Sequence, residues 1–250
     1  MGGIDWGSYA PRLLDGALRT LSFAAVSFLG ANLLGIVVAL ARQSRWLMLR
    51  GVACTYTEII KNTPILTGLF IVYFGLTSAN IVLSAFAAGC LNLSLFYAAY
   101  IAEIYRGSLV SVGRGQYEGA QAVGLSTAKT LRFIVLPQAA QVALPGLGTM
   151  LVDMLKATAL LVTISGAELM TIGQAITSET FRALEVYLVL GAIYFAMCFP
   201  LSQATAKLER ALSSGTPITF RRRRTYRQIV AKLGSDVEQG VRRASTGDWG

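Results

Sequence analysis

The long apolar runs of this chain constrain its fold more than any other feature. Five of them approach or exceed the roughly 20 residues that a helix needs to cross a bilayer. A bilayer offers no water to unpaired backbone groups, so runs of this length are best accommodated as helices. We therefore predict an all-α integral membrane protein with about five membrane helices. The predicted helices cover residues 16–41, 65–77 with an extension back to about residue 56, 81–102, 134–155 and 186–206.

The composition agrees with a membrane protein and excludes several kinds of catalysis. Of 250 residues, 54% are hydrophobic and 14% are charged, whereas an ordinary soluble domain has about 25% charged residues. The chain has no histidine, which excludes a Ser-His-Asp triad and histidine-ligated metals. Its three cysteines are not spaced as metal ligands, and we expect them to be small buried apolar side chains. We therefore expect neither a catalytic nor a metal site.

The basic residues gather on alternate connections between the predicted helices. Of 22 in the chain, three follow the first helix, four lie between the third and fourth, and ten follow the fifth. By the positive-inside rule, the N-terminus is predicted outside and the C-terminus in the cytosol. Residues 10–212 form the predicted transmembrane domain. Residues 213–250, with four arginines at 221–224, are a predicted basic cytosolic tail that contacts anionic lipid rather than nucleic acid, and its order is left open.

A polar segment at residues 118–138, "EGAQAVGLSTAKTLRFIVLPQ", interrupts this pattern on the predicted cytosolic side. Residues 116–123 are predicted as a short amphipathic helix that ends at Gly124, where a left-handed residue is favoured. Ser126 is a predicted N-cap for a second short helix through Phe133, and Pro137 is expected to bend the chain where it re-enters the membrane. On these grounds alone, an ordinary surface loop with two amphipathic turns is equally acceptable.

The order Glu118-Gly119-Ala120, then Gly124, then "IVLP" at 134–137 resembles the EAA motif of permease subunits in bacterial ATP-binding cassette importers. Further stretches are similar to the polar amino-acid permeases of that family: "YTEIIKNTPIL" at 56–66, "AAYIAEIYRGSLVSVGRGQYEGA" at 98–120 and "LKATALLVTISGAEL" at 155–169. The resemblance covers roughly residues 10–210. Gly119 departs from it, since alanine is usual there, and so do Ala157 and Ala159, which replace an aspartate and a serine.

The resemblance implies a type I importer permease fold in which the loop at about 114–137 contains a coupling helix. That helix is expected to dock on a cytosolic ATPase subunit. The implied partners are a second permease chain, identical or different, two ATPase subunits and an extracytoplasmic solute-binding protein in the bacterial inner membrane. No glycine-rich Gly-Lys-Ser/Thr loop is present, so ATP and magnesium are expected on the ATPase subunits and no cofactor in this chain. The residues expected to dock are Glu118, Gly119, Ala120, Gly124, Leu125 and Ser126.

Ionisable residues inside membrane helices are costly and usually face protein or water. Three acid–base pairs stand at i, i+3 spacing, which places both partners on one helical face. They are Glu58–Lys61, Glu103–Arg106 and Asp153–Lys156. The pair at 153 and 156 is predicted toward the outer half of the fourth helix, where a substrate with ammonium and carboxylate groups can exchange with it. Local charge pairing without substrate contact is the alternative for all three.

Thr63-Pro64 predicts a break in the second helix, and a broken membrane helix usually lines a cavity. The candidate path residues are Lys61, Asn62, Thr63, Thr67, Tyr97, Tyr100, Glu103, Asp153 and Lys156. We expect an importer for polar amino acids, with an opine or another amino-acid derivative as the alternative substrate. A secondary transporter or channel for a small polar solute is the alternative function, but it predicts internal repeats that the sequence does not show.

Overall fold

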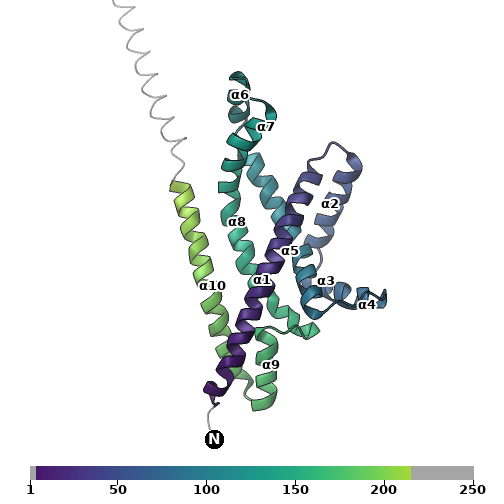
Figure 1. Ribbon diagram of the computed structural model, residues 1–250, viewed down its shortest axis with the longest axis vertical. Coiled ribbons are helices and arrows are strands. Elements are labelled where there is room, and N and C mark those ends of the chain that lie inside the picture. The colour runs from purple at the N-terminus through teal and green to yellow at the C-terminus, as the bar shows by residue number, and fades with distance from the viewer. Residues whose placement is uncertain (1–3, 215–250) are drawn as a thin grey trace, which may run out of the picture. The chain divides into compact units, whose positions relative to one another are not determined.

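The computed structural model describes residues 4–214, and within them every regular element is helical (Figure 1). The predicted tail at 213–250 therefore lies almost wholly outside the described residues. The helices are α1 (Trp6–Arg42), α2 (Leu47–Lys61), α3 (Ile65–Phe70), α4 (Leu76–Ser78), α5 (Ala85–Ser111), α6 (Arg114–Ala122), α7 (Thr127–Thr130), α8 (Leu136–Ala157), α9 (Leu169–Thr180) and α10 (Ala183–Ser214), with π-helical turns η1 (Ile71–Gly75) and η2 (Leu131–Val135) and a 3-10 segment η3 (Thr158–Ile164).

Four helical segments in the described part of the chain are long and apolar enough to cross a membrane. They are α1, α5, the continuous stretch Thr127–Ile164 and Ala183–Leu212. The number rises to five if α2 and Ile65–Ser78 together count as one broken span. The all-α fold with four to five membrane helices is thus as predicted, although each helix begins earlier or ends later than its apolar run.

The central pairing of the bundle is α1 against α5, and small side chains bring the two helices close together (Figure 1). A Cβ atom on Gly35 of α1 would meet Ile101 of α5, so glycine permits the approach. The Ser94 hydroxyl donates to the Ser27 carbonyl oxygen across the same contact at 3.1 Å. Small residues and interhelical hydrogen bonds are the usual means of helix association in lipid, where burial of apolar surface gives no advantage.

A second group of buried residues joins the N-terminal part of α1 to α9 and α10. Leu13, Leu169, Ile176 and Leu190 form its centre, and all are nearly inaccessible. This contact lies at the opposite end of the bundle from α6 and α7 (Figure 1). The segment α9 is therefore held by packing against two long helices rather than by its own length, which is short for an independent helix.

The predicted break at Thr63-Pro64 is confirmed. The helix α2 ends at Lys61, α3 begins at Ile65, and the two are bent by 111°. Proline cannot donate a backbone hydrogen bond and its ring disfavours helical geometry in the residue before it, so the chain turns here. As a result, α3 and α4 point away from the long helices (Figure 1).

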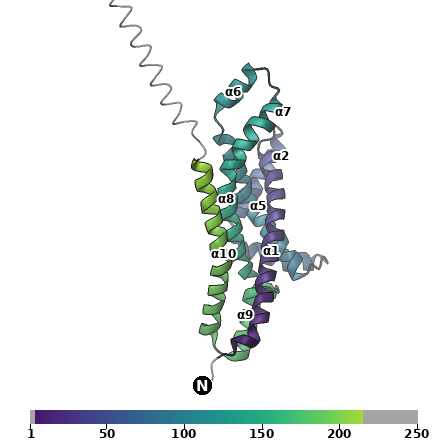
Figure 2. The ribbon, with the colours of Figure 1, turned by 60° about the vertical axis from the view of Figure 1, so that its left-hand side comes forward.

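The polar segment projects beyond the long helices as the pair α6 and α7 (Figure 2). The first short helix is confirmed, with slightly earlier bounds than predicted. The second is not an independent helix ending near Phe133, since α7 continues through η2 into α8 without a break. Pro137 does not interrupt the helix; it directly follows the π-helical turn η2, a local change of hydrogen-bonding pattern that accommodates a residue without an N–H.

Candidate functional site

An open recess of about 480 Å³ lies between α3, α5 and α8. Its polar lining consists of four residues that the sequence had indicated: Tyr97, Tyr100, Asp153 and Lys156. The helix period explains the grouping, because each pair stands at i, i+3 on its own helix and so faces one side. Apolar walls, including Ile65 from the first turn after the break, surround these groups.

Three of the four polar residues of the recess form a connected chain. The Tyr97 hydroxyl donates to Asp153 Oδ2 at 2.9 Å, and Lys156 Nζ lies 3.2 Å from Asp153 Oδ1. The tyrosine is buried, whereas the side chains of Asp153 and Lys156 are 55% and 58% exposed. A buried hydroxyl therefore orients an ion pair that remains accessible from the recess. Such a pair can bind an ammonium and a carboxylate of one small ligand by charge-assisted hydrogen bonds.

Two further candidate residues, Lys61 and Glu103, belong to a separate group of charges, which we call the Glu103 cluster. Glu103 on α5 pairs with Arg42 of α1 at 2.5 Å, with Lys61 of α2 at 3.5 Å and with Arg106 of α5 at 2.9 Å. Lys61 also pairs with Glu58 at 3.5 Å. The three predicted i, i+3 pairs are thus all formed. The contacts of Glu103 with Arg42 and Lys61, which join three helices, were not predicted.

The remaining candidates lie around the helix break rather than in the recess. The Asn62 amide donates to the Glu58 carbonyl oxygen at 2.8 Å, and so stabilises the end of α2. Thr63 is half-buried in the break, and Thr67 is exposed on α3. Neither threonine is among the residues that line the recess described above. Of the break region, it is Ile65 that reaches the recess.

The polar projection has a rigid turn between its two short helices. Gly124 has φ +75°, the left-handed conformation that glycine adopts most readily. The Leu125 N–H bonds the Ala120 carbonyl and the Gly124 N–H bonds the Gln121 carbonyl, which is a Schellman motif. Ser126 is the N-cap residue of α7, as predicted, although its side chain makes no capping hydrogen bond.

The six predicted docking residues all lie in this projection. Glu118, Gly119, Gly124 and Ser126 are exposed, Leu125 is half-buried and Ala120 is buried. A Cβ atom on Gly119 would meet nothing within 4 Å, so no contact within the chain requires glycine there. Tyr117 of α6 packs on a small core that includes Val135 and Ala139. This contact fixes the projection to the start of α8.

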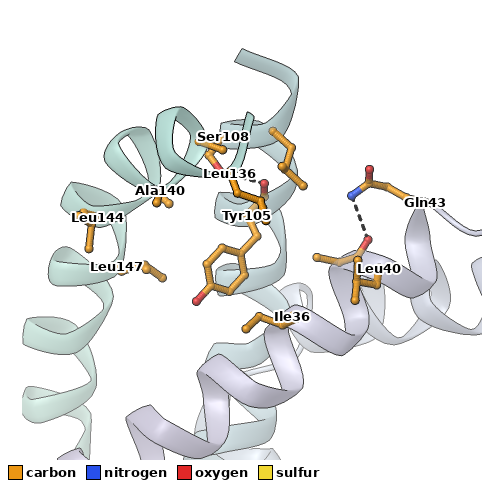
Figure 3. A pocket seen from close by; sticks show the side chains of 13 residues that line it. Ile36, Leu40, Gln43, Tyr105, Ser108, Leu136, Ala140, Leu144 and Leu147 are labelled. Atoms are coloured by element: carbon orange, nitrogen blue, oxygen red, sulfur yellow. Dashed lines mark hydrogen bonds between the residues drawn. The ribbon is translucent and has the colours of Figure 1, made fainter. Parts of the chain in front are cut away.

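A second pocket, of about 380 Å³, lies between α1, α5 and α8 on the side toward the projection. Figure 3 shows its lining, with Ile36 and Leu40 on α1 facing Leu136, Ala140 and Leu144 on α8. The Tyr105 hydroxyl is already bonded to Asn32 Oδ1, at 2.6 Å. This lining is almost entirely aliphatic, so it suits hydrocarbon and offers little to a charged solute.

One carboxylate that was not among the sequence-based candidates, Glu168, is fully buried, with 0% of its surface exposed. Its oxygens accept from the backbone N–H groups of Met170 and Thr171 at 2.9 and 2.8 Å, and from the Tyr194 hydroxyl at 2.8 Å. Glu168 therefore caps α9 and joins it to α10. Glutamate is not a preferred N-cap residue, so local sequence rules do not predict this cap.

An exposed ion pair also joins α1 to α9. Arg12 Nη2 lies 2.9 Å from Glu179 Oε1, and both side chains are nearly half exposed. The hydrogen bond from the Arg12 guanidinium lowers the pKa of the Glu179 carboxyl below its ordinary value. The pair is thus formed at neutral pH and is lost only as acid protonates Glu179.

Comparison with known proteins identifies relatives along most of the chain. The family model described as "Binding-protein-dependent transport system inner membrane component" matches residues 31–214. The probable amino-acid ABC transporter permease protein YckA of Bacillus subtilis (strain 168) is 38% identical over 188 residues, which are 75% of this chain and 83% of that protein. The glutamine transport system permease protein GlnP of Escherichia coli (strain K12) is 33% identical over 213 residues, which cover 83% of this chain and 97% of that protein.

Solved structures give the same result. A chain from the crystal structure of an amino acid ABC transporter with histidines superposes with a TM-score of 0.79 at 33% identity, covering 84% of this chain and 100% of that one. A chain of the MetNI methionine ABC transporter in an inward-facing conformation has a TM-score of 0.66 at 17% identity, covering 80% of this chain and 95% of that one. At that identity, the second likeness supports the fold alone.

Proposed function

Because the chain belongs to the family of binding-protein-dependent transport system inner membrane components, and is thus a multi-pass inner-membrane permease subunit of an ATP-binding cassette importer, we propose that it carries a polar amino acid. The alternatives of a secondary transporter or channel are not favoured by these relatives. The names of the relatives support an amino-acid substrate, and the recess between α3, α5 and α8 supplies the chemistry that such a substrate needs.

The observation that carries the proposal is the accessible Asp153–Lys156 pair beside Tyr97 and Tyr100. An amino acid presents an ammonium and a carboxylate on neighbouring atoms. The ammonium would take the place of Lys156 at Asp153, while the carboxylate would bind Lys156. The ion pair then exchanges one set of charge-assisted bonds for another, so the desolvation cost that excludes ions from membrane proteins is largely offset.

We further propose that the projection formed by α6 and α7 docks on a cytosolic ATPase subunit. Permeases of this family work with ATPase subunits, a second permease chain and a binding protein. For this chain, we propose that ATP and magnesium bind on the ATPase subunits. The exposed Glu118, Gly119, Gly124 and Ser126 offer a surface for docking, and the packing of Tyr117 on Val135 fixes that surface to α8. A displacement of the projection by the ATPase subunit would therefore move α8, the helix that holds Asp153 and Lys156.

The docking proposal is tested by reversing the charge of Glu118. In the complex purified from cells with its ATPase subunits, Glu118→Lys is expected to reduce ATPase co-purification and ATP-dependent uptake together. Asp15→Lys is the matched control, because Asp15 is also an exposed carboxylate and lies in the N-terminal part of α1, at the end of the bundle away from the projection. Normal assembly and full uptake with Glu118→Lys would show that the projection does not dock through this residue.

The number and identity of the permease chains follow from the same preparation. We propose two permease chains per complex with the recess of each facing the shared pathway. Native mass spectrometry of the complex gives the subunit composition, and a single permease chain per complex would contradict this proposal.

A further inference from the structure

The Glu103 cluster lies between the two regions that the proposed function assigns to substrate and to ATPase. On α5, Tyr100 lines the recess, Glu103 follows one turn later, and the helix ends at Ser111, just before the projection. On α2, Lys61 is the last helical residue before the break, and Ile65 beyond the break lines the recess. Glu103 thus connects the helix that leads to the projection with the segment that forms a wall of the recess.

Glu103 is the carboxylate on which all three cations of the cluster converge. Three cations, Arg42 of α1, Lys61 of α2 and Arg106 of α5, approach the Glu103 carboxylate. Glu58 pairs with Lys61. Without the negative charge of Glu103, three cations would face one another and repel. The Glu103 side chain is 25% exposed, so water can reach the cluster and the pairs can break and re-form without leaving a fully buried charge.

We propose that Glu103 is a positioning residue for coupling: it ties α1 and α2 to α5, so that movement of the projection also moves the helix break and the recess wall at Ile65. This inference rests on the proposed function and assigns the mechanical link between its two regions. Glu103 itself need not touch the substrate. If the ion pairs of Glu103 are lost, we expect ATP hydrolysis to continue, while the projection moves without moving the recess wall at Ile65.

The experiment uses the full complex with its ATPase subunits and binding protein in proteoliposomes, and measures ATP hydrolysed per amino acid taken up. Glu103→Gln keeps the size of the side chain and removes its charge. We expect assembly and ATP hydrolysis to persist, with the ATP-to-substrate ratio rising about five-fold, the lower range of coupling between distant sites. Glu58→Gln is the matched control, because Glu58 is an exposed carboxylate of the cluster whose ion pair with Lys61 stays within α2, and its ratio should equal that of the unmodified complex.

A second variant keeps the inference testable if Glu103→Gln does not assemble. Lys61→Met removes only the α2 arm, since Arg42 and Arg106 still pair with Glu103. It is expected to raise the same ratio, and combining it with Glu103→Gln should add little. A ratio unchanged from that of the unmodified complex in both variants, or a proportional loss of uptake and hydrolysis, overturns the inference. If instead the unmodified complex shows no ATP-dependent uptake, the proposed function fails and the inference fails with it.

Discussion

At the scale of single residues, the structure depends on charged groups whose partners lie on other helices. Glu168 is the clearest case, because a fully buried carboxylate must have all its hydrogen bonds satisfied to be tolerated. Its partners come from α9 and, through Tyr194, from α10. The residue therefore holds together the end of the bundle that lies away from the projection.

Removing this carboxylate is predicted to destabilise the protein markedly. Glu168→Ala should cost about 2–4 kcal/mol, because it deletes a helix cap and a charge-assisted hydrogen bond at once. Tyr194→Phe, which removes one hydrogen bond and leaves the cap, should cost about 1 kcal/mol. Thermal unfolding of the purified protein in detergent measures both. A Glu168→Ala melting temperature equal to that of Tyr194→Phe would show that capping of α9 contributes nothing.

The residue scale also shows what could be predicted from sequence. The pairs Glu58–Lys61, Glu103–Arg106 and Asp153–Lys156 followed from helical spacing, and all three are formed. Contacts between helices could not be derived in that way, because they depend on how α1, α2 and α5 pack. The bond from Tyr97 to Asp153 and the pairs that Arg42 and Lys61 make with Glu103 are of this kind.

At the scale of elements, local signals predicted the breaks better than the boundaries. Gly124 and Thr63-Pro64 each turn the chain where the sequence indicated, because their effects on the backbone are intrinsic. The size of the bend at Thr63-Pro64, 111°, had no local signal in the sequence. Pro137 was expected to bend the chain, but the π-helical turn η2 just before it lets the helix continue through the proline.

Two exposed glycines of the projection, Gly119 and Gly124, are predicted to respond in opposite ways to alanine. Gly119 lies within α6 with open space around it, so Gly119→Ala should stabilise that helix by up to about 1 kcal/mol. Gly124 has φ +75°, so Gly124→Ala should cost about 1–2 kcal/mol from backbone strain. Limited proteolysis of the projection measures the difference as a slower and a faster cleavage, respectively. Equal cleavage rates would contradict the assigned conformations.

At the scale of the whole molecule, the distribution of basic residues predicts its orientation. The projection and the connection between α1 and α2 lie at one end, and α9 lies at the other (Figure 1). The basic connections mark the first end as cytosolic. The cytosolic placement of the projection is thus a prediction from the charge distribution.

Sidedness is measured with single cysteines in a variant whose three native cysteines are replaced. Ser126→Cys on the projection should react with a membrane-impermeant thiol reagent only in inside-out vesicles. Ser178→Cys on α9 should react only in right-side-out vesicles, since both serines are exposed in the structure. The reverse pattern would contradict the predicted orientation.

We propose that an amino acid crosses this permease subunit through the recess that contains Asp153 and Lys156. The most direct measurement is uptake of labelled amino acid into proteoliposomes that contain the complex with its ATPase subunits and binding protein. We predict uptake that requires ATP, and a fall of about 10-fold or more with Lys156→Met, the loss of one charge-assisted bond, while assembly is unchanged. Unaltered uptake kinetics in Lys156→Met would contradict the role of the recess, and uptake by the unmodified complex without ATP would contradict the account as a whole.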